Sequence, residues 1–164
     1  MTTPATEENL ALIAQNHSRQ MALCEDLETI ADGLPGNVNH QLCLHLARVV
    51  CPTIAAAQEV EERLLFPVAR ALLAALPDLD ATIERLRWEH FEDMCFAEEL
   101  HDALLSIGRG EPKMTAEAAG YMLRGFFENG GAAIWVVRAD NAAAASWEVL
   151  DANDARAFII PAAW

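Results

Sequence analysis

The chain has 164 residues, of which 53% are hydrophobic and 22% charged, and these values predict one soluble globular domain with a buried core. Its formal net charge of −14 argues against nucleic acid and anionic membrane partners, because both need clusters of lysine and arginine. No stretch reaches the roughly 18 to 20 apolar residues of a membrane span, and the N-terminus has no secretory pattern, so a cytoplasmic protein is expected.

Two long helices are predicted in the first half of the chain. The first runs from about residue 7 to 32 and ends at the Gly-Leu-Pro-Gly segment 33–36. Its apolar stripe is Leu10, Ile13, His17, Met21, Cys24 and Leu27. The second begins near Asn37 or Asn39, either of which can cap it, and continues to about Ala75. Pro52 is expected to kink it, and Pro67 to kink it again or break it.

Two further helices complete the predicted fold. The third is capped by Asp80 and ends near Ile107, and the fourth is capped by Thr115 and ends near Glu128. The stripe of the third helix is Ile83, Leu86, His90, Met94 or Asp93, Ala97 and Leu104. The pattern predicts an all-α, up-down-up-down four-helix bundle over residues 1–150, with an irregular, apolar C-terminal tail over residues 151–164. The four cysteines form no CxxC pair and lie in helical patterns, which predicts reduced, buried thiols.

The strongest candidate for chemistry is the run Gln-Glu-Val-Glu-Glu-Arg-Leu-Leu-Phe-Pro at residues 58–67. Glu62 shares a helix face with Gln58 and Leu65, and a carboxylate on a buried stripe needs a cation, a metal ion or a hydrogen-bond network. His17 and His90 lie on the apolar faces of two other helices, and imidazole with carboxylate suits iron, manganese or zinc. Alternatively, Glu61 and Glu62 form a solvated face paired with Arg63 or with a neighbouring helix.

Three short motifs resemble those of the hemerythrin-like (HHE cation-binding) family over about residues 8–128. They are Asn16-His17, the Glu-Glu-Arg-Leu-Leu-Phe-Pro run at 61–67, and Glu89-His90. The resemblance implies a four-helix bundle with a carboxylate-bridged di-iron site that binds oxygen or handles iron, nitric oxide or redox signals. His17, Glu62 and His90 match ligand positions of that family.

The ligand set implied by the resemblance is incomplete. Gln58 stands where the family has a histidine, and Ala133 and Val137 stand near the positions of a histidine and a carboxylate on the fourth helix. Three possibilities follow: a degenerate bundle that binds no metal or binds it weakly, a one-metal site, or a di-iron site completed by other residues. The one-metal site would use His17, Glu62 and His90, with Glu61, Asp93 or water as further donors.

The expected function is therefore metal binding, with mononuclear or dinuclear iron as the cofactor and oxygen or nitric oxide as a small ligand. Gln58 and Glu61 are the lesser candidates for the metal site. No base, nucleophile or phosphate loop stands out, so a conventional enzyme is not expected. The alternative is a metal-free structural or interaction module, in which the apolar tail would drive self-association into a homo-oligomer.

Overall fold

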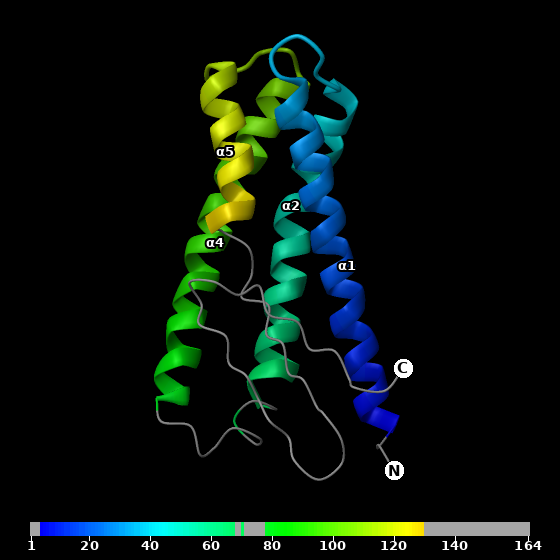
Figure 1. The fold of residues 1–164 in the computed structure, drawn as a ribbon, viewed down its shortest axis with the longest axis vertical. Coiled ribbons are helices and arrows are strands. Elements are labelled where there is room, and N and C mark those ends of the chain that lie inside the picture. The colour runs from blue at the N-terminus through cyan, green and yellow to red at the C-terminus, as the bar shows by residue number, and fades with distance from the viewer. Residues whose placement is uncertain (1–3, 68–69, 71–77, 130–164) are drawn as a thin grey trace.

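The computed structural model describes residues 4–67, 70 and 78–129. All elements in these ranges are helical, and no strand occurs among them (Figure 1). The elements are α1 (Pro4–Gly33), α2 (His40–Val60), the π-helical turn η1 (Glu61–Leu65), α4 (Leu79–Gly108) and α5 (Ala116–Asn129). In the predicted continuation of the second helix to Ala75, residues 66, 67 and 70 are helical. Residues 68–69 and 71–75 and the predicted tail at 151–164 lie outside the described residues.

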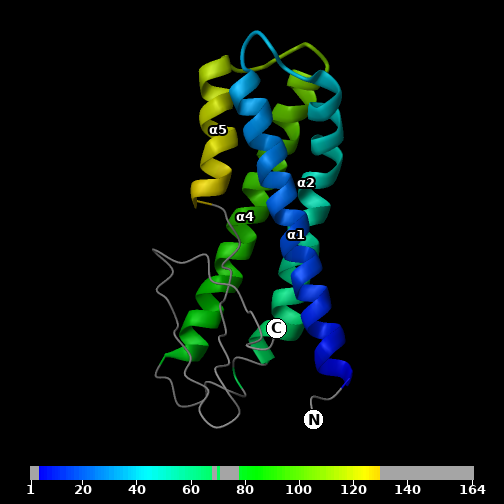
Figure 2. The same cartoon turned by 45° about the vertical axis from the view of Figure 1, so that its right-hand side comes forward.

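The helices lie side by side as a bundle (Figures 1 and 2). The loop between α1 and α2 and the loop between α4 and α5 lie together at one end of the bundle, which we call the loop end. Because α5 has 14 residues and α4 has 30, α5 accompanies α4 only over the half nearest the loop end. None of the helices in the described ranges is long and apolar enough to cross a membrane.

Two predicted helix caps are confirmed and one is wrong. The Leu42 backbone N–H donates to the Asn39 side chain over 3.1 Å at the start of α2. The Ala118 backbone N–H donates to the Thr115 hydroxyl oxygen over 3.2 Å at the start of α5. Asp80 does not cap the third helix, because α4 begins at Leu79, after Asp78 in a left-handed conformation with φ of 65°, and Asp80 lies inside its first turn.

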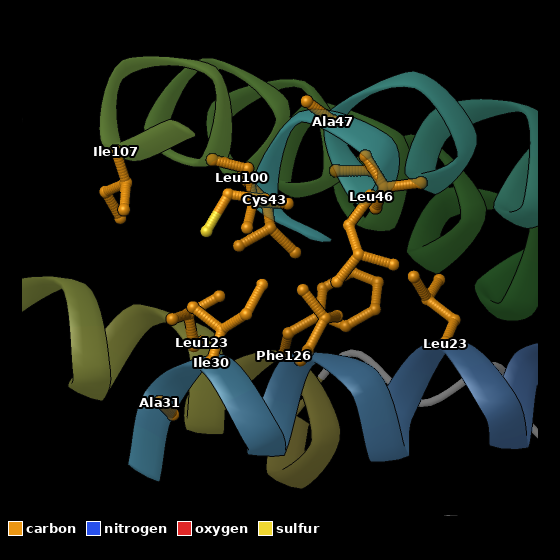
Figure 3. Close-up of a cluster of buried hydrophobic side chains, with 14 of the residues drawn as sticks. Leu23, Ile30, Ala31, Cys43, Leu46, Ala47, Leu100, Ile107, Leu123 and Phe126 are labelled. Carbon is orange, nitrogen blue, oxygen red and sulfur yellow. The ribbon is translucent and has the colours of Figure 1, made fainter. Parts of the chain in front are cut away.

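An apolar cluster fills the loop end, where α1, α2, α4 and α5 all contribute side chains (Figure 3). The labelled residues of this cluster include Leu23, Ile30, Cys43, Leu46, Leu100, Leu123 and Phe126. A second, smaller cluster of Phe66, Ile83 and Leu86 lies toward the opposite end. The stripe predicted for α4 is confirmed, with its apolar members and His90 buried or half-buried.

The stripe predicted for the first helix is only partly correct. Leu27 is fully buried, but Met21 is exposed and Leu23 is buried in its place. The buried positions Asn16, Leu23, Leu27 and Ile30 step by 7, 4 and 3 residues, which is the heptad-like spacing of bundle helices. Two predicted members, His17 and Cys24, are half-buried and each lie one residue after a buried one, Asn16 and Leu23.

The expectation of buried thiols holds for Cys43, which lies in the core, and fails for Cys95, which is exposed on α4. Pro52 lies inside α2 and has no N–H for the carbonyl of Arg48. One turn away, the His101 ring donates from Nδ1 to the backbone carbonyl of Ala47, which links α4 to α2. His101 therefore has a structural role between the two helices.

Candidate functional site

The site is built on the turn that follows α2. Phe66 donates its backbone N–H to the carbonyl of Glu61, a bond between residues five apart, which defines the π-helical turn. In such a turn residue i+5 lies beneath residue i, so Phe66 is brought onto the same face as Glu61. The Pro67 ring, which has no N–H, follows immediately. The turn thus places two neighbouring carboxylates and an aromatic ring opposite α4.

His90 of α4 faces both carboxylates. Its Nε2 lies 2.9 Å from Glu61 Oε2, and its Nδ1 lies 3.2 Å from Glu62 Oε1. His90 and Glu61 are only 5% and 6% exposed, whereas the Glu62 side chain is 44% exposed. The sequence favoured Glu62 as the inward carboxylate, but the buried partner of His90 is Glu61. Arg63, proposed as a partner of both glutamates, instead pairs with Glu59 at 2.7 Å.

The two carboxylates determine the charge that His90 prefers. Ionised carboxylates only accept hydrogen bonds, so both contacts are satisfied together when the imidazole is protonated and donates from both nitrogens. Burial lowers the pKa of His90, but the hydrogen bonds and negative charges of Glu61 and Glu62 outweigh it, and the net pKa is raised. Burial raises the pKa of Glu61, and its bond to His90 opposes that rise.

Further side chains hold His90 in place. The Phe66 ring stacks on the imidazole, with ring centroids 5.8 Å apart and an interplanar angle of 11°. The Gln58 amide donates to the backbone carbonyl of His90 over 2.8 Å. Gln58, predicted as a minor metal donor, therefore links α2 to the backbone of α4 next to the Glu61–His90 pair. Sequence reasoning missed Phe66, although its position in the Leu-Phe-Pro ending was a signal.

Asp93 lies one turn after His90 and is half-buried. Burial raises its pKa to about 7, with contributions from Glu61, Glu89 and Glu92, while the charge of His90 lowers it. A carboxyl group with this pKa changes its charge near neutral pH. Four titratable side chains, Glu61, Glu62, His90 and Asp93, thus influence one another between α2–η1 and α4.

His17, the remaining predicted ligand, lies on α1 and is half-buried. Burial lowers the pKa of its imidazole, so the neutral form that ligates metals is favoured. A site that used His17 together with Glu61 and His90 would be built from three helical segments. Ala133 and Val137 lie outside the described residues.

Glu61 Oε2 and His90 Nε2 are the two donor types that could hold a metal ion together. Their separation of 2.9 Å is a hydrogen-bond distance, and two donors bound at right angles to one ion about 2.1 Å away would also be about 3 Å apart. Glu62 at the other ring nitrogen is arranged like the carboxylates that orient metal-bound histidines. Within the described ranges, however, no group of three or more His, Cys, Asp or Glu side chains is arranged to hold an ion.

No family model, no curated protein and no solved structure matches this chain. The resemblance to the hemerythrin-like family therefore stays a prediction from the motifs quoted above.

Proposed function

We propose that this chain is a hemerythrin-like, up-down-up-down bundle that binds a metal ion, with iron as the preferred metal. The observation that supports this most is the buried contact of 2.9 Å between Glu61 and His90, with Glu62 on the second nitrogen of the same ring. Burying two ionisable groups costs several kcal/mol each, and pairing them often does not recover that cost, so we infer that this pair serves a function and not the stability of the fold.

The proposed roles differ between the two glutamates. Glu61 Oε2 and His90 Nε2 would hold the ion, and Glu62 would orient the imidazole by accepting from Nδ1. His17 is the candidate for a further donor from α1. A bound iron would supply an open coordination position for a small ligand such as oxygen or nitric oxide. The role is binding or sensing, and we do not propose a catalysed reaction.

Elemental mass spectrometry tests this function on untagged protein that has been expressed with added iron and purified without chelators. We expect about one metal ion per folded chain, reduced at least about tenfold in His90→Ala and in Glu61→Gln. His40→Ala is the matched control, because His40 Nδ1 donates to the Ile107 carbonyl at the loop end and should not affect metal content. Circular dichroism would verify that each variant is folded. Metal-free wild-type protein would contradict the proposal.

A second function is supported by the same contacts: a metal-free structural or interaction module. Both nitrogens of His90 face carboxylates, and such an imidazolium could tie α4 to the α2–η1 segment without any ion. Adding iron or zinc to the purified protein distinguishes the two functions. A ligand that binds the folded state raises the unfolding midpoint with its concentration, whereas a metal-free module would show no such shift.

A further inference from the structure

A cavity of about 410 Å³ lies at the loop end and is partly open to solvent. Its walls come from residues 34–38 of the loop between α1 and α2, from the loop between α4 and α5, and from the adjoining ends of α2, α4 and α5. The volume is within the roughly 300 to 1,000 Å³ of small-molecule sites in proteins. His40 opens α2, and Glu61 follows its last residue about 30 Å further along, so the cavity is separate from the Glu61–His90 pair.

Hydrogen bonds hold both of the loops that enclose this cavity. In the first loop, the Asn37 backbone N–H donates to the Gly33 carbonyl over 2.7 Å. In the second, the Gly110 backbone N–H donates to the Ile107 carbonyl over 2.9 Å. A methyl group at Gly36 would meet no heavy atom beyond its chain neighbours within 4 Å, so the space beside this glycine is not filled by side chains. The cavity is therefore preformed, and binding in it costs little ordering of the chain.

The side chains that line the cavity indicate what it can bind. None of them is charged, although 22% of the chain is. An ion would leave water here without an opposite charge to pair with, so the cavity favours an uncharged ligand. Pro35 and Pro112 contribute apolar rings from the two loops, and Met114 contributes a polarisable thioether, which contacts aromatic rings favourably. An aromatic body suits these walls.

His40, which lines the cavity, determines the polar contact that a ligand needs. Its Nδ1 lies 2.8 Å from the Ile107 carbonyl oxygen, which only accepts, so Nδ1 carries the proton. In the neutral ring Nε2 then carries a lone pair. Among the described residues, no side chain or backbone group bonds to His40 Nε2. A ligand that donates an N–H or O–H therefore complements this ring.

We propose that the loop-end cavity binds a small, uncharged aromatic molecule that carries one N–H or O–H donor. The aromatic body packs between the apolar side chains of the two loops, and the donor faces His40 Nε2. Indoles and phenols are molecules of this class. The site is independent of the proposed metal site, so the failure of either proposal leaves the other in place.

Indole and 1-methylindole are the two probes, added to the full-length chain and followed by ¹H–¹⁵N NMR spectra. We expect indole to cause saturable shifts of loop-end amides such as those of Val38 and Gly110. Binding of 1-methylindole should be at least about threefold weaker, because its ring nitrogen cannot donate. The absence of saturable shifts with indole, or shifts centred away from the loop end, would overturn the proposal.

His40→Ala tests the polar contact. This variant should bind indole about threefold more weakly than the wild type and should bind the two probes alike. Equal affinities of the two probes for the wild type would overturn the donor requirement. A preference for indole that persists in His40→Ala would overturn the role of His40 and place the acceptor on another group of the wall, such as the Asn37 side chain.

Filling the cavity tests its location. Ala116→Phe adds a ring to the wall and should raise the Kd for indole at least about tenfold. Ala118→Phe is the matched control, because Ala118 is exposed on the same helix and is not part of the wall, and its Kd should be unchanged. Gly36→Leu is a second filling variant, at a position with open space beside it. Circular dichroism verifies folding, and wild-type affinity in both filled variants would overturn the proposal.

Discussion

The two ends of the bundle use the same helices in opposite ways. At the loop end, α2 and α4 bury apolar side chains such as Leu46 and Leu100 against α1 and α5. Toward the other end, the α2–η1 segment and α4 bury Glu61 and His90 beside the small cluster that contains Phe66. Apolar burial stabilises a fold directly, whereas buried ion pairs often contribute nothing to stability or reduce it. Among the described residues, the loop end thus holds most of the apolar burial, whereas the Glu61–His90 end holds the buried charges on which the proposed function rests.

The largest effect is expected at the loop end. Leu27→Ala should lower the free energy of unfolding by about 3 to 5 kcal/mol, because Leu27 is fully buried and its removal leaves a cavity. Leu12→Ala is the matched control on the same helix, where the side chain is exposed and the loss should stay below about 1 kcal/mol. Urea unfolding followed by circular dichroism measures both. Equal losses in the two variants would contradict the assignment of the core.

The next largest loss of unfolding free energy is expected when the imidazole of His90 is removed. In the presence of a chelator, His90→Phe should lower the free energy of unfolding by about 3 kcal/mol, because Glu61 is then left buried without its partner. Glu61→Leu/His90→Phe should recover most of that loss, since no unpaired charge remains.

The exposed ion pair between Arg63 and Glu59 provides the control for this pair of variants. Removing it with Glu59→Gln should change the free energy of unfolding by less than about 0.5 kcal/mol. If Glu61→Leu/His90→Phe is as unstable as His90→Phe, the Glu61–His90 contact itself holds this end of the bundle together.

Most of the helical architecture could be predicted from the sequence, because it depends on local signals. The caps at Asn39 and Thr115 and the stripe through His90 follow from side-chain chemistry and the period of 3.6 residues. The start of α4 could not be predicted from Asp80, because Asp78 adopts a left-handed conformation and the helix starts directly after it.

The sequence correctly indicated that one carboxylate of the Glu61–Glu62 pair is buried, but it favoured Glu62, and the buried residue is Glu61. The buried face of α2 passes through Val50, Ile54 and Ala57 to Glu61, with steps of 4, 3 and 4. Ala57 gives a weak apolar signal, so the neighbouring face through Gln58 and Glu62 was favoured instead. The π-helical turn could not be anticipated either, because no local composition marks an i to i+5 bond. That turn is what brings Phe66 onto His90.

The smallest effect is a pH dependence of the free energy of unfolding, which comes from titratable groups at the Glu61–His90 end of the bundle. The folded-state pKa of Asp93 is raised to about 7 and those of His90 and Glu61 are also raised, so at these three groups the folded protein binds more protons than the unfolded chain, whereas the lowered pKa of His17 acts in the opposite direction. The free energy of unfolding should therefore fall as pH rises. For Asp93 the fall covers roughly pH 4 to 7, and for His90 it begins above about pH 6.5 and continues through its raised pKa.

We expect a total loss of about 1 to 2 kcal/mol between pH 5 and 8, measured by urea unfolding with a chelator present. Asp93→Asn should flatten the curve below pH 7 and leave the slope from His90 above it, because the amide cannot ionise. Glu99→Gln, an exposed position on the same helix, should keep the wild-type slope. A curve that is the same in Asp93→Asn as in the wild type would contradict the raised pKa of Asp93, because the variant removes that carboxyl group alone.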